Sequence, residues 1–201
     1  LAFLAKAGSE LKPMRWIAVN LSATSLTHPR YLAMVSAALD ESGVDASKLC
    51  FEITETSVIS NLSQAKRFMH QLQKRGCSFA LDDFGTGFAS FKHLRELEFD
   101  ELKLDTGFVR GLGHDKAAEV LVQGFLGIGK GLGVKVIAEG VETETQRQLL
   151  RQMGCTVCQG FYYSPAMPHA EARDALWRQH NLGVPFTKTR PNEETESDDA
   201  A

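Results

Sequence analysis

Several features that assign a protein to a special class are missing from this 201-residue sequence. No stretch approaches the ~18 consecutive apolar residues of a membrane-spanning helix. No basic segment followed by an apolar core and a cleavage site marks a secretory signal. The net charge of −3 lacks the basic excess typical of proteins that bind duplex nucleic acid. We therefore expect a cytoplasmic domain with no duplex nucleic-acid partner. Because the chain begins at Leu1, we also expect a longer parent protein. The sequence does not decide whether that parent is tethered to a membrane.

Cysteine is also scarce, with only Cys50, Cys77, Cys155 and Cys158. A chain of this length with four cysteines is not a disulfide scaffold. Cys155 and Cys158 form one C-x-x-C pair, but a structural zinc site needs a second pair at a suitable spacing. The sequence therefore predicts buried, reduced thiols and no zinc site.

What is present is ordinary globular composition, with 43% hydrophobic and 23% charged residues. The length fits one domain. The excess negative charge is concentrated in Thr187–Ala201, which holds five acidic and two basic residues and has no apolar periodicity. We therefore predict one folded domain over residues 1–183 and an acidic, disordered tail over residues 184–201.

Short apolar runs alternate with amphipathic stretches along the chain. The predicted strands are Trp16–Asn20, Leu49–Thr54, Ser78–Asp82, Glu101–Leu104, Lys135–Ala138 and Thr156–Gln159. The predicted helices are Pro29–Ser42, Asn61–Arg75, Lys116–Lys130, a segment that begins at a Thr143/Gln146 capping box, and Ala170–Arg178. Alternating strands and helices imply parallel strands joined by crossovers.

Spacing alone fits both a doubly wound sheet and a (β/α) barrel, and the alternation within each strand decides between them. Phe51 and Ile53 flank Glu52, and Leu102 and Leu104 flank Lys103. A doubly wound sheet is apolar on both faces, whereas a barrel can gather polar groups at the carboxyl ends of its strands. We therefore predict an α/β fold of the TIM-like (β/α) barrel type, incomplete here, with about six of the barrel strands.

Polar residues follow the predicted strands at their carboxyl ends. They are Asn20, Glu52, Asp82, Asp83, Lys103, Asp105, Glu139 and Gln159. In a barrel these ends meet at one mouth, where crowded carboxylates stay ionised only beside a cation. Oxygen ligands favour hard divalent ions. Asp82 and Asp83 are placed to contact two ions ~3.5–4 Å apart, a device used for phosphodiester hydrolysis.

Six ordered motifs carry a resemblance to a known family. They are Asn20-Leu21-Ser22, Phe51-Glu52-Ile53-Thr54-Glu55, Asp82-Asp83-Phe84-Gly85-Thr86-Gly87, Lys103-Leu104-Asp105, Ala138-Glu139-Gly140-Val141-Glu142 and Gln159-Gly160-Phe161. This set, over about Leu11 to Pro168, resembles the EAL-domain family of cyclic di-GMP (c-di-GMP) phosphodiesterases.

The resemblance implies metal-dependent hydrolysis of c-di-GMP to the linear diguanylate pGpG, with two Mg²⁺ or Mn²⁺ ions. It implies metal ligands at Asn20, Glu52, Asp82 and Asp83, catalytic residues at Lys103 and Glu139, and supporting or substrate-contacting residues at Glu55, Asp105, Glu142 and Gln159. Glu55 is expected to steady the loop Asp83–Ser90, which the family uses in metal binding and dimerisation. A homodimer and flanking sensory or diguanylate-cyclase-like domains are the implied partners.

This chain also departs from the family pattern. The Glu-Ala-Leu segment that names the family, with a further metal-binding Glu and a substrate-contacting Arg, has no counterpart here. Leu1–Lys12 resembles the end of the helix that precedes Asn20, so two barrel strands are expected to be missing. Gly87–Ser90 lacks two hydroxyls that are common in the family. The alternatives are therefore a c-di-GMP sensor without activity and an inactive fragment.

Two local patterns imitate other sites. Gly124–Gly131 nearly spells a phosphate-binding loop, but it lacks the Ser or Thr that holds Mg²⁺ and lies between a helix and a strand in the wrong order. We interpret it as a glycine-rich helix end. Asp83-Phe84-Gly85 matches a kinase triplet, but the other kinase motifs are absent from the sequence.

Overall fold

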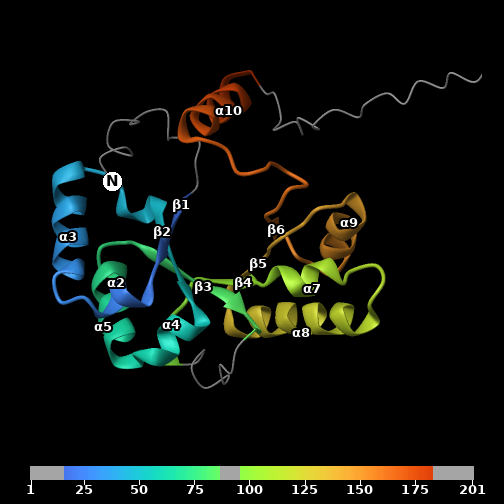
Figure 1. Ribbon diagram of the computed structural model, residues 1–201, viewed down its shortest axis with the longest axis horizontal. Helices are drawn as coiled ribbons and strands as arrows, with labels where there is room; N and C mark the ends of the chain where they lie inside the picture. The colour runs from blue at the N-terminus through green and yellow to red at the C-terminus, as the bar shows by residue number, and fades with distance from the viewer. Residues whose placement is uncertain (1–15, 87–95, 183–201) are drawn as a thin grey trace, which may run out of the picture.

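The computed structural model describes residues 16–86 and 96–182. A six-stranded, fully parallel sheet in the order β1-β2-β3-β4-β5-β6 runs through its middle (Figure 1). The strands are β1 Ile17–Leu21, β2 Leu49–Thr54, β3 Ser78–Phe84, β4 Glu101–Leu104, β5 Lys135–Ala138 and β6 Val157–Cys158. The predicted alternation and parallel pairing are confirmed, and β1 and β3 end beyond their predicted limits.

Helices connect successive strands. In the described residues they are α2 Ala23–Thr27, α3 Tyr31–Ser42, the 3-10 helix η2 Ala46–Lys48, α4 Glu55–Ser60, α5 Leu62–Gln73, α7 Thr106–Arg110, α8 Lys116–Leu132 and α9 Glu144–Gln152. A further helix, α10 His169–Leu182, follows the last strand. The five predicted helices are all present. The short helices α2, α4 and α7 escaped prediction because one turn and a half is too short to show a helical period. Gly124–Gly131 lies within α8, so the phosphate-loop pattern is a helix.

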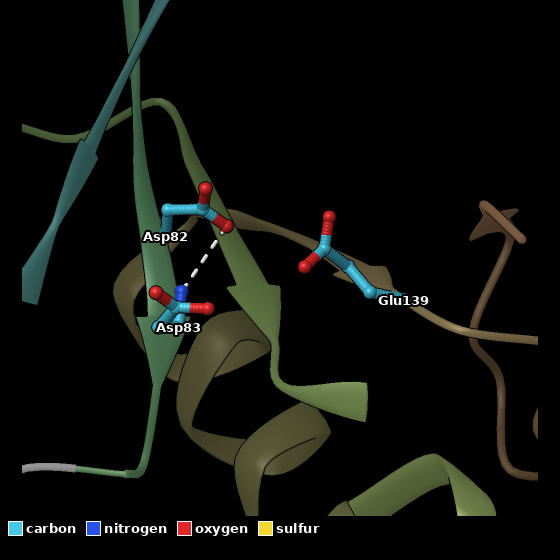
Figure 2. A group of neighbouring side chains, drawn as sticks. All are labelled: Asp82, Asp83 and Glu139. Atoms are coloured by element: carbon cyan, nitrogen blue, oxygen red, sulfur yellow. Dashed lines mark hydrogen bonds between the residues drawn. The ribbon is translucent and has the colours of Figure 1, made fainter. Parts of the chain in front are cut away.

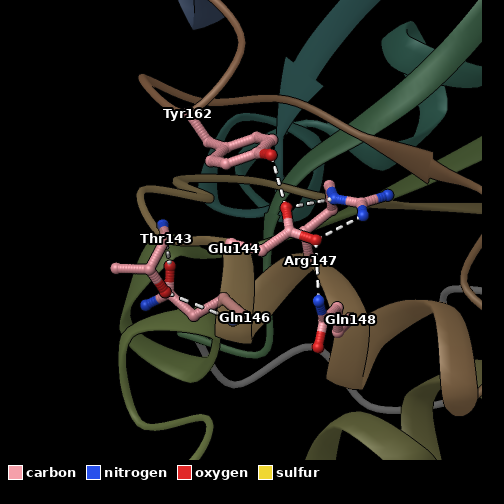
Figure 3. Close-up of polar contacts among 6 residues, drawn as sticks. All are labelled: Thr143, Glu144, Gln146, Arg147, Gln148 and Tyr162. Carbon is pink, nitrogen blue, oxygen red and sulfur yellow. Dashed lines mark hydrogen bonds and ion pairs between the residues drawn. The ribbon is translucent and has the colours of Figure 1, made fainter.

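The start of α9 follows the predicted capping box. Gln146 N–H donates to Thr143 Oγ1 at 3.2 Å, and Thr143 N–H donates to Gln146 Oε1 at 3.0 Å (Figure 3). Both bonds satisfy backbone donors that the first helical turn leaves open. The cap thus fixes where the chain turns into α9 after Glu139 and Val141.

The outer face of the sheet forms the hydrophobic core with the helices. Phe79 lies 5.6 Å from Phe51 with the rings tilted, and meets Phe68 of α5 edge-on at 6.4 Å, measured between ring centroids. Leu72 of α5 and Val122 of α8 are fully buried against the same layer. Each such side chain contributes about 1.5–3 kcal/mol of burial free energy. This packing holds the strands rigid enough to position side chains on the other face.

The inner face carries polar side chains at two levels. At the amino ends of the strands lies a set we call the lower layer, made of Trp16, Cys50, Glu101 and Lys135. Lys135 Nζ lies 2.5 Å from Glu101 Oε1 and 4.4 Å from the centroid of the Trp16 ring. Cys50 Sγ donates to Glu101 Oε2 at 3.8 Å. The upper level, at the carboxyl ends, is the candidate site.

Within the described residues the sheet is open, because β1 pairs only with β2 and β6 only with β5. Helix α10 stands apart from the sheet and buries none of its residues (Figure 1). In the part of the chain that the structure describes, no helix is both long and apolar enough to cross a membrane. The predicted tail 184–201, the Leu1–Lys12 segment and the loop Gly87–Ser90 lie outside the described residues.

Candidate active site

Lys103 of β4 lies at the centre of the upper polar level. Its Nζ is 2.9 Å from Glu52 Oε1, 3.0 Å from Asp82 Oδ1 and 2.8 Å from Glu139 Oε1. Parallel strands bring their carboxyl ends to one edge, so β2, β3, β4 and the residue after β5 each supply one of these side chains. Lys103 is only 3% exposed. One buried ammonium group thus faces three carboxylates.

The electrostatics of this cluster are unbalanced. Burial alone would lower the pKa of Lys103, but hydrogen bonds and charges from Glu139 and Glu52 outweigh it and raise this pKa. Lys103 therefore stays protonated. Burial raises the pKa of Glu139, the Lys103 contact opposes that rise, and the charges of Asp82 and Glu52 add to it. The cluster therefore holds more negative charge than its single cation compensates.

Asp82 and Asp83 point to the same side although they are adjacent. In a regular strand, neighbouring side chains alternate between the two faces. Here the β3–β4 register shifts between Leu81 and Phe84, so two residues of β3 stand opposite Lys103 alone. Asp83 also adopts a left-handed φ of 54°, which Asp tolerates better than most residues. The bulge brings both carboxylates to one mouth.

Buried Glu55 holds the turn that follows. Gly85 N–H donates to Glu55 Oε2 at 3.2 Å. Gly85 has a φ of +97°, and a Cβ there would lie 2.8 Å from Phe108 Cε2, so the turn requires glycine. The family resemblance implies that Glu55 steadies Asp83–Ser90, and its bond to Gly85 N–H is the contact seen in the described part of that loop.

Asp82, Asp83 and Glu139 form a group that could hold a metal ion. Their ligand oxygens all lie within 4.8 Å of one another. Figure 2 shows the carboxylates of Asp82 and Glu139 facing each other, with Asp83 beside them; Lys103, whose Nζ contacts Asp82 and Glu139, is not drawn. Asp83 N–H also donates to Asp82 Oδ1 at 3.1 Å. A donor set made only of carboxylate oxygens fits a hard divalent cation such as Mg²⁺ or Mn²⁺.

Asp105 and Asn20 border this group. Asp105 Oδ1 accepts from Gly107 N–H at 2.8 Å and so caps α7. Its charge acts on Asp83, whose pKa is raised first by burial and then by Asp82 and Asp105. Asn20 is exposed at the end of β1 and is the direct register partner of Glu52. Both residues therefore lie at the same mouth as the cluster.

Two of the predicted site residues, Glu142 and Gln159, have their side chains outside the Lys103 cluster. Glu142 is exposed, and its described ion pair is with Arg110 of α7, at 3.8 Å between Oε1 and Nη2. The side chain of Gln159 is exposed too, while its backbone N–H donates to Ala138 O at 2.8 Å and its carbonyl accepts from Val141 N–H at 3.0 Å. Gln159 thus braces the chain on both sides of Glu139, and neither side chain joins the Lys103 ion pairs.

A supporting contact beside Glu139 was not in the predicted set. Gly140 has a φ of +68°, and a Cβ there would lie 2.3 Å from Thr106 Cγ2. The start of α7 therefore packs directly on the turn that carries Glu139. The glycine next to an acidic strand end was the only sequence signal for this close approach.

Comparisons with known proteins agree with this architecture. The family model described as "EAL domain" matches residues 1–166. Among relatives in Pseudomonas aeruginosa, the bifunctional diguanylate cyclase/c-di-GMP phosphodiesterase MucR is 38% identical over 152 residues, which are 76% of this chain and 22% of MucR. The c-di-GMP phosphodiesterase NbdA is 34% identical over 160 residues, 80% of this chain and 20% of NbdA. This chain therefore spans about a fifth of these relatives.

Solved structures show the same fold. The PaMucR phosphodiesterase in complex with c-di-GMP aligns with a TM-score of 0.74 at 36% identity, covering 78% of this chain and 64% of that one. BlrP1 from Klebsiella pneumoniae, in a manganese/c-di-GMP complex, aligns with a TM-score of 0.74 at 30% identity, covering 81% and 42%. The open sheet described above thus corresponds to part of a TIM-like barrel, as predicted. On this evidence the chain belongs to the EAL domain family.

Proposed function

We propose that this domain hydrolyses c-di-GMP to pGpG with the help of two Mg²⁺ or Mn²⁺ ions. The observation that carries the proposal is the convergence of Glu52, Asp82 and Glu139 on Lys103 Nζ, at 2.8–3.0 Å, from separate strands. The relatives MucR and NbdA, named as c-di-GMP phosphodiesterases, support the substrate, and the manganese complex of BlrP1 supports the ion.

Asn20, Glu52, Asp82 and Asp83 are the residues we assign to the ions. When bound, such ions polarise the phosphodiester and activate water for attack on phosphorus. Asp82 and Asp83 lie side by side at the β3 bulge, which suits contact with two neighbouring ions. Glu52 and Asn20 are register partners on the adjacent strands. The excess negative charge of the mouth favours cation binding before any substrate arrives.

Lys103 and Glu139 are the residues we assign to the reaction itself. Lys103 is held protonated, so its Nζ can stabilise negative charge that develops on the phosphate oxygens. Glu139 has a raised pKa and a partly open carboxylate, properties that suit accepting a proton from the attacking water. Their 2.8 Å contact orients both groups. Glu55, Asp105, Glu142 and Gln159 are assigned to support this arrangement or contact the substrate.

We further propose that the parent protein is a homodimer with flanking regulatory domains. The relatives extend far beyond the matched region, and MucR combines a diguanylate cyclase with its phosphodiesterase. The domain proposed here covers residues 1–183, with residues 184–201 as a separate tail. Sedimentation of the parent protein at several concentrations tests the dimer.

The function is tested with the parent protein, c-di-GMP and either Mg²⁺ or Mn²⁺, with the product separated by chromatography. We expect pGpG to form, to stop on chelation of the metal, and to be nearly lost in Asp82→Asn. Glu41→Gln, on the exposed side of α3, is the matched control and should keep full activity. If the protein binds c-di-GMP tightly but forms no product at any metal concentration, the proposed hydrolysis is wrong and the domain is a c-di-GMP sensor.

A further inference from the structure

The mechanism proposed above does not use Cys158, at the end of the edge strand β6, or Cys155, just before that strand. Both are free thiols. Cys155 is buried, and its Sγ lies 3.3 Å from Val157 O and 3.8 Å from Val136 O. Cys158 lies on β6 opposite Ala138 and is partly exposed. One residue of the pair is thus partly exposed, and its neighbour is buried.

The surroundings of Cys158 stabilise a thiolate. The Cys155 thiol is hydrogen-bonded to it, the Tyr163 hydroxyl donates to it, and the Arg147 guanidinium lies nearby. The Cys155 hydrogen bond is the largest influence and, with Tyr163 and Arg147, outweighs burial, so the pKa of Cys158 falls to about 7. The same contact, together with burial, raises the pKa of Cys155. Near neutral pH a large share of Cys158 is therefore ionised, whereas Cys155 stays protonated.

A hydrogen-bonded network holds these neighbours in place. Arg147 Nε and Nη2 donate to the two oxygens of Glu144 at 2.7 and 2.5 Å, and the Tyr162 hydroxyl donates to the same carboxylate (Figure 3). Tyr162 and Tyr163 meet edge-on, with ring centroids 5.2 Å apart. Glu144 shares the charge of Arg147, so the direct hydrogen-bond donors matter most at the sulfur.

The other two cysteines provide an internal contrast. Burial raises the pKa of Cys50 to about 12 and that of Cys77 to about 11. Both are almost fully buried. Thiol–disulfide exchange proceeds through an accessible thiolate, so Cys50 and Cys77 should react slowly at neutral pH.

We propose that Cys155 and Cys158 form a reversible redox-modification site for low-molecular-weight disulfides, with Cys158 as the attacking thiol and Cys155 as the resolving thiol. The Cys158 thiolate attacks one sulfur of the disulfide RSSR, forms a mixed disulfide and releases RS⁻, which takes up a proton. Cys155 then loses its proton and attacks the Cys158 sulfur, releasing the second thiol. In sum, two protein thiols and RSSR give one protein disulfide and two RSH.

The position of the pair connects it to the candidate active site. Cys158 directly precedes Gln159, whose two backbone hydrogen bonds, to Ala138 and Val141, bracket Glu139. A disulfide restrains its two Cα atoms to within about 7 Å, and thereby constrains the segment that ends at Gln159. We expect oxidation to lower c-di-GMP hydrolysis, a consequence that rests on the proposed function. The modification itself does not depend on that function.

The test treats the parent protein with glutathione disulfide at pH 7.5, quenches with acid, digests it and maps each cysteine by mass spectrometry. We expect a Cys155–Cys158 disulfide in the wild type and a glutathione adduct on Cys158 in Cys155→Ser. In Cys158→Ser, Cys155 should remain reduced. Cys158 should react at least about tenfold faster than Cys50 or Cys77 in the same molecules.

Each contrary outcome overturns a stated part of the proposal. If Cys158 reacts no faster than Cys50, the site is refuted, and because every thiol is read in the wild type, this does not depend on a variant folding. A stable glutathione adduct on wild-type Cys158 refutes the resolving role of Cys155. Oxidation that leaves hydrolysis unchanged refutes the link to Glu139. A parent protein without hydrolysis refutes the proposed function, while the mapped disulfide still decides the redox site.

Discussion

The two polar levels inside the sheet have the same kinds of residues in different proportions. In the lower layer one lysine, Lys135, faces one carboxylate, Glu101, and its charge also lies over the Trp16 ring. In the upper level Lys103 faces three carboxylates, with Asp83 close by. In a balanced pair the two charges neutralise each other, whereas the unbalanced cluster keeps a net negative charge that a bound cation can neutralise. The charge ratio thus separates a supporting contact from a candidate reaction site.

The largest expected difference between the two levels is in catalysis. Glu139→Gln should lower kcat for c-di-GMP hydrolysis by roughly 10²–10⁴, the range for loss of a general base. Glu101→Gln removes a carboxylate from the lower layer and should leave kcat almost unchanged. Rates measured under saturating substrate and metal compare the two. Equal losses in both variants would mean that Glu139 acts through the fold and not in the reaction.

Replacing the lysine of each level, one at a time, should lower the free energy of unfolding by different amounts. Lys103→Met leaves the buried Glu52 and the half-buried Asp82 and Glu139 without their shared ammonium group, and should cost about 3–5 kcal/mol in metal-free buffer. The Lys135 side chain is 41% exposed against 4% for Lys103. Lys135→Met removes the more exposed partner of buried Glu101, which keeps the Cys50 thiol as a donor, and should therefore cost less than Lys103→Met does. Amide hydrogen exchange of β4 in the parent protein measures both, and a larger loss in Lys135→Met would reverse the comparison.

Metal addition should sharpen the contrast further. An ion that binds only the folded state stabilises it by about 2.7 kcal/mol at 100 times its Kd. Mg²⁺ or Mn²⁺ should therefore protect β3 and β4 from hydrogen exchange in the wild type. Asp83→Asn should lose most of that protection, and Glu101→Gln should keep it. Undiminished protection in Asp83→Asn would place the ions elsewhere.

The smallest effect is an alkaline one in the lower layer. Burial raises the pKa of Cys50 to about 12 from an ordinary value of 9.0, and the charges of Glu101 and Glu52 add to the rise. Because the folded pKa is the higher one, the stability contribution is complete below about pH 9 and is lost as pH rises toward 12. At pH 10 the loss is about 1.4 kcal/mol.

Cys50→Ala tests this effect, because it removes the titrating thiol. Between pH 8 and pH 10 the wild type should lose more protection from hydrogen exchange, corrected for the intrinsic exchange rate, than the variant does. The control is Glu41→Gln, on the exposed side of α3, which keeps the buried Cys50 and Cys77 thiols. Cys77→Ala should reduce the alkaline loss as well, because burial raises the pKa of Cys77 to about 11. A Cys50→Ala variant that loses as much stability as the wild type would assign the alkaline loss to other groups.

The sequence predicted the strands, the long helices and the α9 cap, because hydrophobic alternation and capping residues act locally. It also predicted that Glu52, Asp82, Lys103 and Glu139 meet, because parallel strand ends share one edge. The roles assigned to these residues stay predictions.

Other features depended on tertiary structure. Strand alternation would send Asp83 away from Asp82, and only the bulge with its left-handed φ reverses this. Glu101 and Lys135 share the inward parity of Lys103 and Glu139, but nothing local indicated that they pair with each other. Glu142 follows the motif order of the family, yet its described partner, Arg110, lies on a short helix that the sequence did not reveal.

The Lys103 cluster draws its members from β2, β3, β4 and the residue after β5, and no two of its carboxylates come from the same strand. The complete cluster therefore forms only when all four strands are in place. If any one of these strands detaches, at least one carboxylate or the ammonium leaves the group. Partly folded molecules should therefore have no hydrolytic activity. The total rate measured for a sample of this domain would then be proportional to its fraction of fully folded molecules. A destabilising mutation far from the mouth would lower that fraction without changing kcat of each folded molecule.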